Sequence, residues 1–112
     1  MPVTTKVVQT VPITGIAAAF TACNVDGEQF INDGKTCLEF KNTSGGALTV
    51  LINNQVPCED GYDHDITITV PPTTGDMRVA PLPINRFNDA NGYVQMTYPG
   101  GITDLTIAAF NY

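Results

Sequence analysis

The stretch NDGKTCLEFKNTSGGALTVLIN, residues 32–53, decides the fold class of this sequence. Hydrophobic and polar residues alternate along residues 36–41, with Leu38 and Phe40 on one face of the expected strand. The alternation returns along residues 47–52, after a polar turn that contains two glycines. A period of two is the pattern of a half-buried β-strand, and two such runs around a glycine-rich turn predict a β-hairpin. The turn is longer than two residues, which favours a bulged or longer hairpin loop.

The same alternation recurs along most of the chain. It is clearest in DITITV, residues 65–70, where Ile66, Ile68 and Val70 share one face. Glycines, prolines and asparagines separate three further runs with this pattern, residues 76–80, 93–98 and 104–110. Residues 16–23, IAAAFTAC, carry three alanines that favour a helix, but the segment is short and lacks a cap. We therefore expect a strand there, with small side chains that face a packed neighbour.

Short strands with a turn about every ten residues predict an all-β protein, a compact antiparallel β-sandwich with about eight short strands. A jelly-roll-like topology is favoured, and an Ig-like topology is the alternative. At 112 residues the chain has the length of one domain. The β-prone residues 4–11 lie between two prolines, which suits an edge strand rather than a central one. The expected division is an N-terminal edge strand or arm, residues 1–15, and a single β-sandwich domain, residues 16–112.

The charge of the chain argues against a nucleic-acid partner. The formal net charge is −6, and binding to phosphates needs clustered basic side chains. The five basic residues lie far apart in the sequence: Lys6, Lys35, Lys41, Arg78 and Arg86. Only 14% of the residues are charged, against about 25% in a typical soluble protein. A surface this poor in charge tolerates burial against a protein partner, because the cores of interfaces are depleted of charged residues.

The cysteines and the first residues indicate where the protein is made. Cys23, Cys37 and Cys58 are an odd number and form no C-x-x-C pair, so we expect reduced thiols rather than a disulfide framework. The first residues lack the basic start and apolar core of a signal peptide. No run approaches the ~20 apolar residues of a membrane span. These features predict synthesis in a cytoplasm and no membrane partner.

The segment EDGYDHD, residues 59–65, is the best candidate for a chemical site, because it holds the only histidine, His64. Asp60, Asp63 and Asp65 are hard oxygen ligands, but the spacing of an EF-hand calcium loop is absent. Two interpretations stay open, an acidic solvated loop and a contact with a divalent ion or a partner. The first is favoured, so we expect no bound metal and no cofactor.

No arrangement of nucleophiles indicates an enzyme. Ser44, the only serine, sits in a glycine turn and lacks the G-x-S-x-G context of a hydrolase. Nothing places a cysteine next to His64, and buried structural thiols are the commoner case. The phenylalanines are expected in the core rather than on a ligand-binding surface: Phe20, Phe30, Phe40, Phe87 and Phe110. Tyr112 ends an apolar segment that either packs on its own sandwich or meets a neighbouring molecule.

A series of turn and strand motifs between Ala18 and Phe110 resembles a known family. The motifs are FINDG at residues 30–34, LEFKNTSGG at 38–46, TV at 49–50, ITITVP at 66–71, PLP at 81–83, FN at 87–88, GYV at 92–94 and TIAA at 106–109. In size and pattern the chain is similar to the small capsid decoration proteins, also called cement or staple proteins, of short-tailed bacteriophages of the epsilon-fifteen type. That family has no catalytic residues to transfer to this chain.

The resemblance implies a virion structural protein on the outer capsid surface, made in the host bacterial cytoplasm. Such a protein clamps neighbouring major capsid subunits as a dimer or trimer, and it stabilises the shell because it binds the assembled form. The N-terminal strand would pair with a partner through its backbone edge. Exposure arguments give these interface residues: Thr4, Lys6, Val8, Gln9, Cys58, Glu59, Asp60, Tyr62, His64 and Tyr112.

Two alternatives belong to other functional classes. The first is a receptor- or glycan-binding module of a phage tail or fibre, for which Tyr62 and the acidic loop are the only hint. The second is a component of the head–tail connector, which generally forms rings. Copy number separates them, because decoration predicts hundreds of copies per virion and the alternatives predict about a dozen or fewer.

Overall fold

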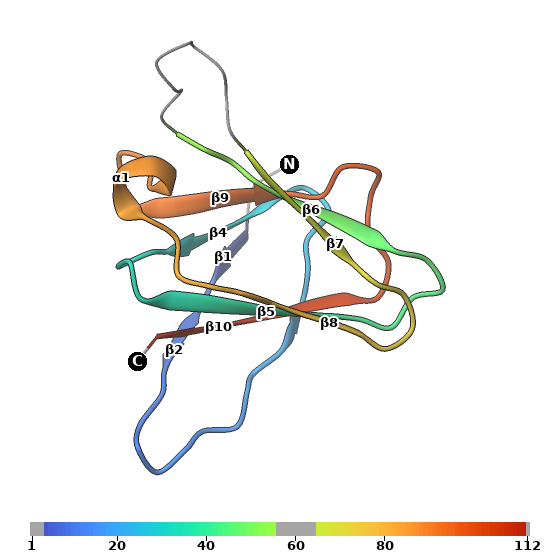
Figure 1. Ribbon diagram of the computed structural model, residues 1–112, viewed down its shortest axis with the longest axis horizontal. Helices are drawn as coiled ribbons and strands as arrows, with labels where there is room; N and C mark the ends of the chain where they lie inside the picture. The colour runs from blue at the N-terminus through green and yellow to red at the C-terminus, as the bar shows by residue number, and fades with distance from the viewer. Residues whose placement is uncertain (1–3, 56–64, 112) are drawn as a thin grey trace.

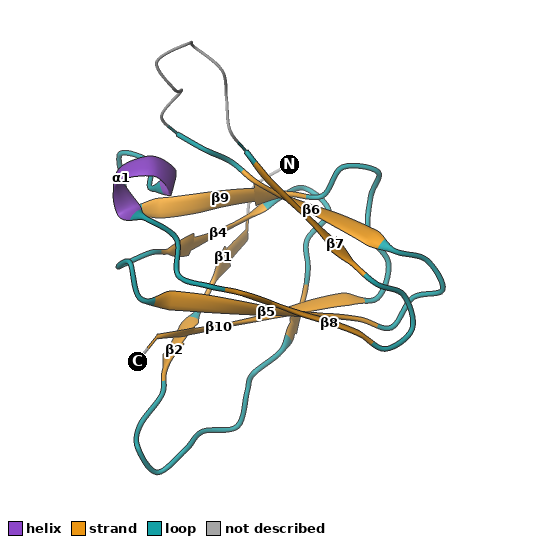
Figure 2. Ribbon diagram, in the orientation of Figure 1, coloured by secondary structure: helices purple, strands orange, loops and turns teal. Residues whose placement is uncertain are grey.

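The structure is a computed structural model that describes residues 4–55 and 65–111. Within these ranges it contains ten strands and one short helix, arranged as two sheets packed face to face (Figures 1 and 2). The elements are β1 (Thr4–Lys6), β2 (Val8–Thr10), β3 (Thr21–Ala22), β4 (Glu28–Ile31), β5 (Thr36–Asn42), β6 (Leu48–Ile52), β7 (Ile66–Val70), β8 (Gly75–Val79), α1 (Ile84–Phe87), β9 (Tyr93–Thr97) and β10 (Leu105–Asn111). The all-β sandwich predicted from the alternating sequence is confirmed.

The strand order is that of a jelly roll. Sheet A has the order β1-β4-β9-β6-β7, and sheet B has the order β2-β10-β5-β8, with β3 also paired to β10. The antiparallel pairs β6–β7, β5–β8, β4–β9 and β3–β10 are nested one inside the next. This nesting is what results when one long two-stranded ribbon is wrapped into two sheets. The jelly-roll topology therefore holds, and the Ig-like alternative does not.

The N-terminal segment differs from the predicted single strand. It forms two three-residue strands, and each pairs in parallel with a strand of a different sheet, β1 with β4 and β2 with β10. Val7, which separates them, is 83% exposed where the chain crosses from sheet A to sheet B. We call residues 4–10 the strap, because they connect the two sheets along one side of the sandwich. The strap makes both sheets mixed rather than purely antiparallel, and it raises the strand number above eight.

The hairpin predicted between residues 36–41 and 47–52 is wrong. Both segments are strands with the predicted inward faces, but β5 belongs to sheet B and β6 to sheet A. The turn between them crosses from one sheet to the other, and Asn42 holds it. The Asn42 side chain donates hydrogen bonds to the carbonyls of Gly46 (3.0 Å) and Val70 (3.2 Å) and accepts one from the Ser44 backbone N–H (2.9 Å). An alternating pattern shows that a strand has a buried face, but it does not identify the partner strand.

The predicted strand over residues 16–23 is also mostly wrong, because only Thr21 and Ala22 are in strand conformation. β10 offers one free edge, which β2 occupies at residues 109–111 and β3 at residues 106–107. Residues 11–20 connect the two strands as an exposed loop. Helix α1 was not predicted from the sequence. With four residues, it is the longest helix within residues 4–55 and 65–111, and no helix there is long and apolar enough to cross a membrane.

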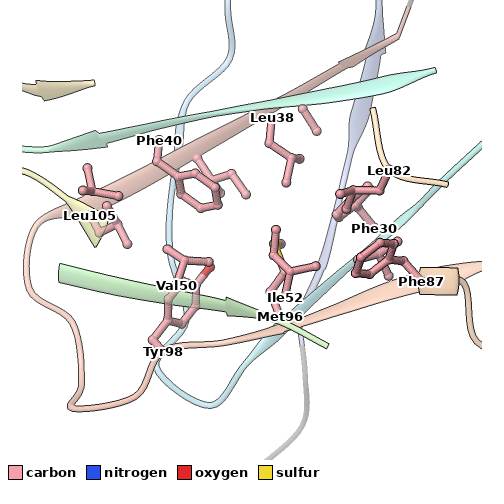
Figure 3. Packing of buried hydrophobic residues seen from close by; sticks show 14 residues of the cluster. Phe30, Leu38, Phe40, Val50, Ile52, Leu82, Phe87, Met96, Tyr98 and Leu105 are labelled. Atoms are coloured by element: carbon pink, nitrogen blue, oxygen red, sulfur yellow. The ribbon is translucent and has the colours of Figure 1, made fainter. Parts of the chain in front are cut away.

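The core lies between the sheets and consists of large side chains from both (Figure 3). Leu38, Phe40 and Leu105 come from sheet B and face Val50, Ile52 and Met96 from sheet A (Figure 3). Phe30 and Phe87 fill the end of the sandwich next to α1. Three of the five phenylalanines are thus in the core as predicted, whereas Phe20 and Phe110 are only partly buried.

Gly75 provides a test of the tight corner between β7 and β8. A Cβ atom at this buried glycine would collide with the backbone carbonyl of Pro71. Because backbone atoms cannot yield as a flexible side chain does, Gly75→Ala is expected to lower the free energy of unfolding by about 2 kcal/mol or more. Denaturant unfolding measures this loss. Gly46→Ala is the matched control, since a Cβ there meets nothing within 4 Å, and an equal loss in both variants would contradict the expectation.

Candidate functional site

The outer face of sheet B carries charged, polar and apolar side chains together. Because side chains alternate across a strand, the inward positions of β5 and β10 leave Cys37, Glu39 and Lys41 on the outer face with Thr106, Ala108 and Phe110. The registers place these residues in three rows that continue onto β8. The rows are Phe110 beside Cys37, then Ala108 beside Glu39 and Arg78, then Thr106 beside Lys41 and Asp76.

The loop of residues 11–20, the β2–β3 loop, folds against this face. It leaves β2 and returns to β3 below sheet B in the orientation of Figure 1. The Gln9 side chain holds its returning half by accepting a hydrogen bond from the Ala19 N–H (2.9 Å) and donating one to the Ala17 carbonyl (3.3 Å). The Phe20 ring lies 4.4 Å from the Lys41 ammonium. Ala108 is 2% exposed although it points away from the core.

The tip of the β2–β3 loop is apolar and open to solvent. Its sequence, VPITGIAAAF, contains no charged residue. Ile13 is fully exposed and Ile16 is 45% exposed. With Val7 of the strap, they make up half of the six large hydrophobic side chains that are exposed in the described part of the chain. Two exposed isoleucines on one uncharged loop make this segment a candidate contact surface for a partner.

A groove of about 530 Å³ lies between the β2–β3 loop and the outer face of sheet B. Val11, Ile16 and Ala18 form the loop side, and Phe110 and Ala80 contribute apolar surface from the sheet. The polar lining comes from three side chains in the same rows: Cys37, Glu39 and Arg78. Its volume and largely apolar lining are those of a site for a ligand or for inserted side chains.

Glu39 is the central charge of the groove. Its side chain is only 12% exposed, and its carboxylate lies 3.6 Å from Nε of Arg78, whose side chain is 79% exposed. Burial raises the pKa of Glu39 above its ordinary value, a hydrogen bond with Asp76 and the charge of Asp76 raise it further, and Arg78 and Lys41 lower it. The two carboxylates thus repel one another, and the exposed guanidinium compensates only part of this repulsion.

A second polar cluster lies under the strap. The Lys6 ammonium pairs with the fully buried Glu28 carboxylate at 2.8 Å and donates hydrogen bonds to the Ala22 carbonyl (2.6 Å) and the Thr21 hydroxyl (2.9 Å). The Tyr98 hydroxyl donates to the other oxygen of Glu28. These bonds attach β1 to β3 and β4, so the cluster has a clear role in holding the strap.

Cys23 lies beside Tyr98 and Glu28 in this cluster, and its thiol is not activated as a nucleophile. Burial is the main reason why the pKa of Cys23 rises to about 12, and the Glu28 charge adds to it. Cys23 is therefore a neutral thiol at physiological pH, and the thiolate is the reactive form. Burial, together with Cys23 and Glu28, also raises the pKa of Tyr98. Within residues 4–55 and 65–111, no three His, Cys, Asp or Glu side chains form a group able to hold a metal ion.

The predicted interface residues fall into two sets. Thr4 is exposed, whereas Lys6, Val8 and Gln9 are partly buried and make contacts within the protein: Lys6 binds Glu28, Val8 packs against the core, and Gln9 holds the β2–β3 loop. The other predicted residues lie outside the described residues: Cys58, Glu59, Asp60, Tyr62, His64 and Tyr112. For both sets the interface stays a prediction.

The sequence interpretation missed the loop tip and the groove. A signal for the first was present, since residues 11–20 contain two isoleucines and no charge. The interpretation of residues 16–23 as a packed strand hid the exposure of Ile16. The groove had no local signal, because Val11, Glu39, Arg78 and Phe110 come together only through strand pairing.

Comparison of the chain with protein-family models, curated proteins and solved structures found no match.

Proposed function

We propose that this protein binds the outer surface of an assembled phage capsid and cements neighbouring major capsid subunits. The class comes from the sequence resemblance described above. The observation that carries the proposal is the exposed apolar tip of the β2–β3 loop, with Ile13 fully open to solvent. A tip of this kind stabilises an assembly when it inserts between partner subunits, because apolar area then leaves water.

The strap and the β2–β3 loop are both fixed to the sandwich, which favours such a role. Lys6 fixes the strap to the buried Glu28, and Gln9 fixes the returning half of the loop through two hydrogen bonds. A loop anchored in this way loses less conformational freedom when it binds than a free arm would, so more of the contact energy appears as affinity. Binding to the assembled shell, and not to dissociated subunits, then raises the stability of the shell by mass action.

The test mixes purified protein with capsids that lack it and measures copy number and capsid melting together. We expect saturable binding at hundreds of copies and a higher melting temperature. Ile13→Ser should weaken binding about tenfold, since removal of a buried aliphatic anchor at an interface costs an amount of this order. Val25→Ser is the matched control, because Val25 is also exposed but lies on a different loop.

The outcomes separate the functional classes. No binding, or about a dozen copies with unchanged melting, would contradict the cement function and would favour a tail module or a connector component. Saturable binding that Ile13→Ser and Val25→Ser weaken equally would remove the β2–β3 loop from the interface. Circular dichroism of both variants checks that they are folded before the capsid measurement.

A further inference from the structure

The groove under the β2–β3 loop does not include the exposed Ile13, although it shares Ile16 with the loop tip. The groove opens between the loop and sheet B, whereas Ile13 does not line it. Its apolar lining comes from Val11 and Ile16 on one side and Phe110 on the other. A volume of about 530 Å³ accommodates a few side chains of an extended segment but not a folded domain.

The charged side chains that line the groove favour some kinds of bound group over others. Glu39 is largely shielded from water, and its guanidinium partner, 3.6 Å away, is mostly in solvent. Asp76 lies beside Glu39, and Arg78 and Lys41 offset part of the charge of these two carboxylates. An anionic occupant would add a third negative charge. A purely apolar occupant would remove the remaining water from Glu39 and give it no new partner, which is unfavourable for a carboxylate.

We propose that the groove receives an extended protein segment in which a lysine or arginine lies beside an aliphatic side chain. The basic group pairs with Glu39 and Asp76, and the aliphatic group packs on Phe110, Val11 and Ile16. Under the proposed function, on which this assignment of a protein partner rests, the segment belongs to the major capsid subunit. Burial and the neighbouring Asp76 raise the pKa of Glu39, and a cation placed beside both carboxylates would stabilise their charged forms.

The experiment uses short peptides and isotopically labelled protein, and it requires no capsid. Three acetylated and amidated tripeptides are titrated by NMR: isoleucine–lysine–valine, isoleucine–norleucine–valine and isoleucine–glutamate–valine. We expect the lysine peptide to bind in the millimolar range and to shift signals of the groove residues. The norleucine peptide should bind about fivefold more weakly, since it lacks the charge pair, and the glutamate peptide weaker still.

Two variants with opposite expected effects keep the test independent of folding. Glu39→Gln should remove the preference for lysine over norleucine. Arg78→Gln should strengthen binding of the lysine peptide about twofold, because the guanidinium that competes for Glu39 is gone. Lys35→Gln is the matched control for the loss of one positive charge, since Lys35 is exposed and does not line the groove; it should leave the affinity unchanged.

Three results would overturn the proposal: equal affinity for the lysine and norleucine peptides, weaker binding by Arg78→Gln, or shifts confined to sheet A. Movement of the groove signals on dilution of the protein alone would identify a second copy as the occupant, which also overturns it. Peptide binding without capsid binding would refute the cement function and retain the groove. Capsid binding without peptide binding would do the reverse.

Discussion

Replacing Lys6 with methionine is expected to lower the free energy of unfolding by about 3 kcal/mol. The variant keeps most of the aliphatic length of the side chain but leaves the fully buried Glu28 carboxylate without its cation. Removal of one member of a buried ion pair costs about 3–5 kcal/mol, because the remaining charge stays desolvated. The lower end applies here, since Tyr98 and the Asn24 backbone N–H still donate hydrogen bonds to Glu28. Chemical denaturation at neutral pH measures the loss.

The double variant Lys6→Met with Glu28→Gln identifies the cause of that loss. A glutamine retains an oxygen for the Tyr98 hydroxyl and carries no charge, so it should restore part of the stability lost in Lys6→Met. The two substitutions are therefore expected to be strongly non-additive in a double-mutant cycle. Strict additivity would show that Lys6 acts through its contacts with Thr21 and Ala22 rather than through Glu28.

Replacing Phe40 with alanine is expected to cost about 4 kcal/mol, the largest effect of any substitution considered. Phe40 is completely buried in the middle of β5, the strand that pairs with β10 on one side and β8 on the other. Loss of the ring removes buried apolar area and leaves a cavity that the two sheets cannot close without moving. Thermal and denaturant unfolding should agree on the loss.

Phe20→Ala serves as the matched control for the Phe40 variant. Phe20 lies at the end of the β2–β3 loop, on the outer face of sheet B, and its ring contacts Lys41 rather than the core. Its removal should cost about 1 kcal/mol or less, the range of a partly exposed cation–π contact. Similar losses for both variants would mean that the β2–β3 loop contributes to the stability of the protein as much as the core does.

The sequence was sufficient to predict the strands with an alternating pattern and the direction of their side chains. Ile66, Ile68 and Val70 point inward, as do Val94 and Met96, because a buried face requires this alternation whatever the partner. The sequence was a poorer guide to which strands pair with one another. Residues 36–41 and 47–52 are adjacent in the chain and suggested a hairpin, but their hydrophobic faces meet across the core instead of sharing a sheet. Burial alone cannot distinguish these two arrangements.

The candidate site depended on information that no local pattern holds. The alanines of residues 16–23 fit a packed strand and an exposed loop equally well. Only Thr21 and Ala22 form a strand, because β2 already occupies part of the β10 edge. Helix α1 is a single turn next to prolines, too short to leave a periodic signal. Glu39 and Arg78 are opposite each other only because β5 pairs with β8, a contact between residues about forty positions apart in the sequence.

The nested strand pairs have a consequence for how the protein folds. Leu48 pairs with Val70, whereas Ala22 pairs with Thr106, so each successive pair closes a longer loop of chain. Loop-closure entropy favours the β6–β7 pair as the first to form, and the non-local pairs should make folding slow for a protein of this size. Within the strap, β1 pairs with β4, but β2 needs β10, the last of the described strands to be synthesised. A nascent chain therefore keeps residues 8–10 without their strand partner until β10 has been made, and chaperones have access to them during that interval.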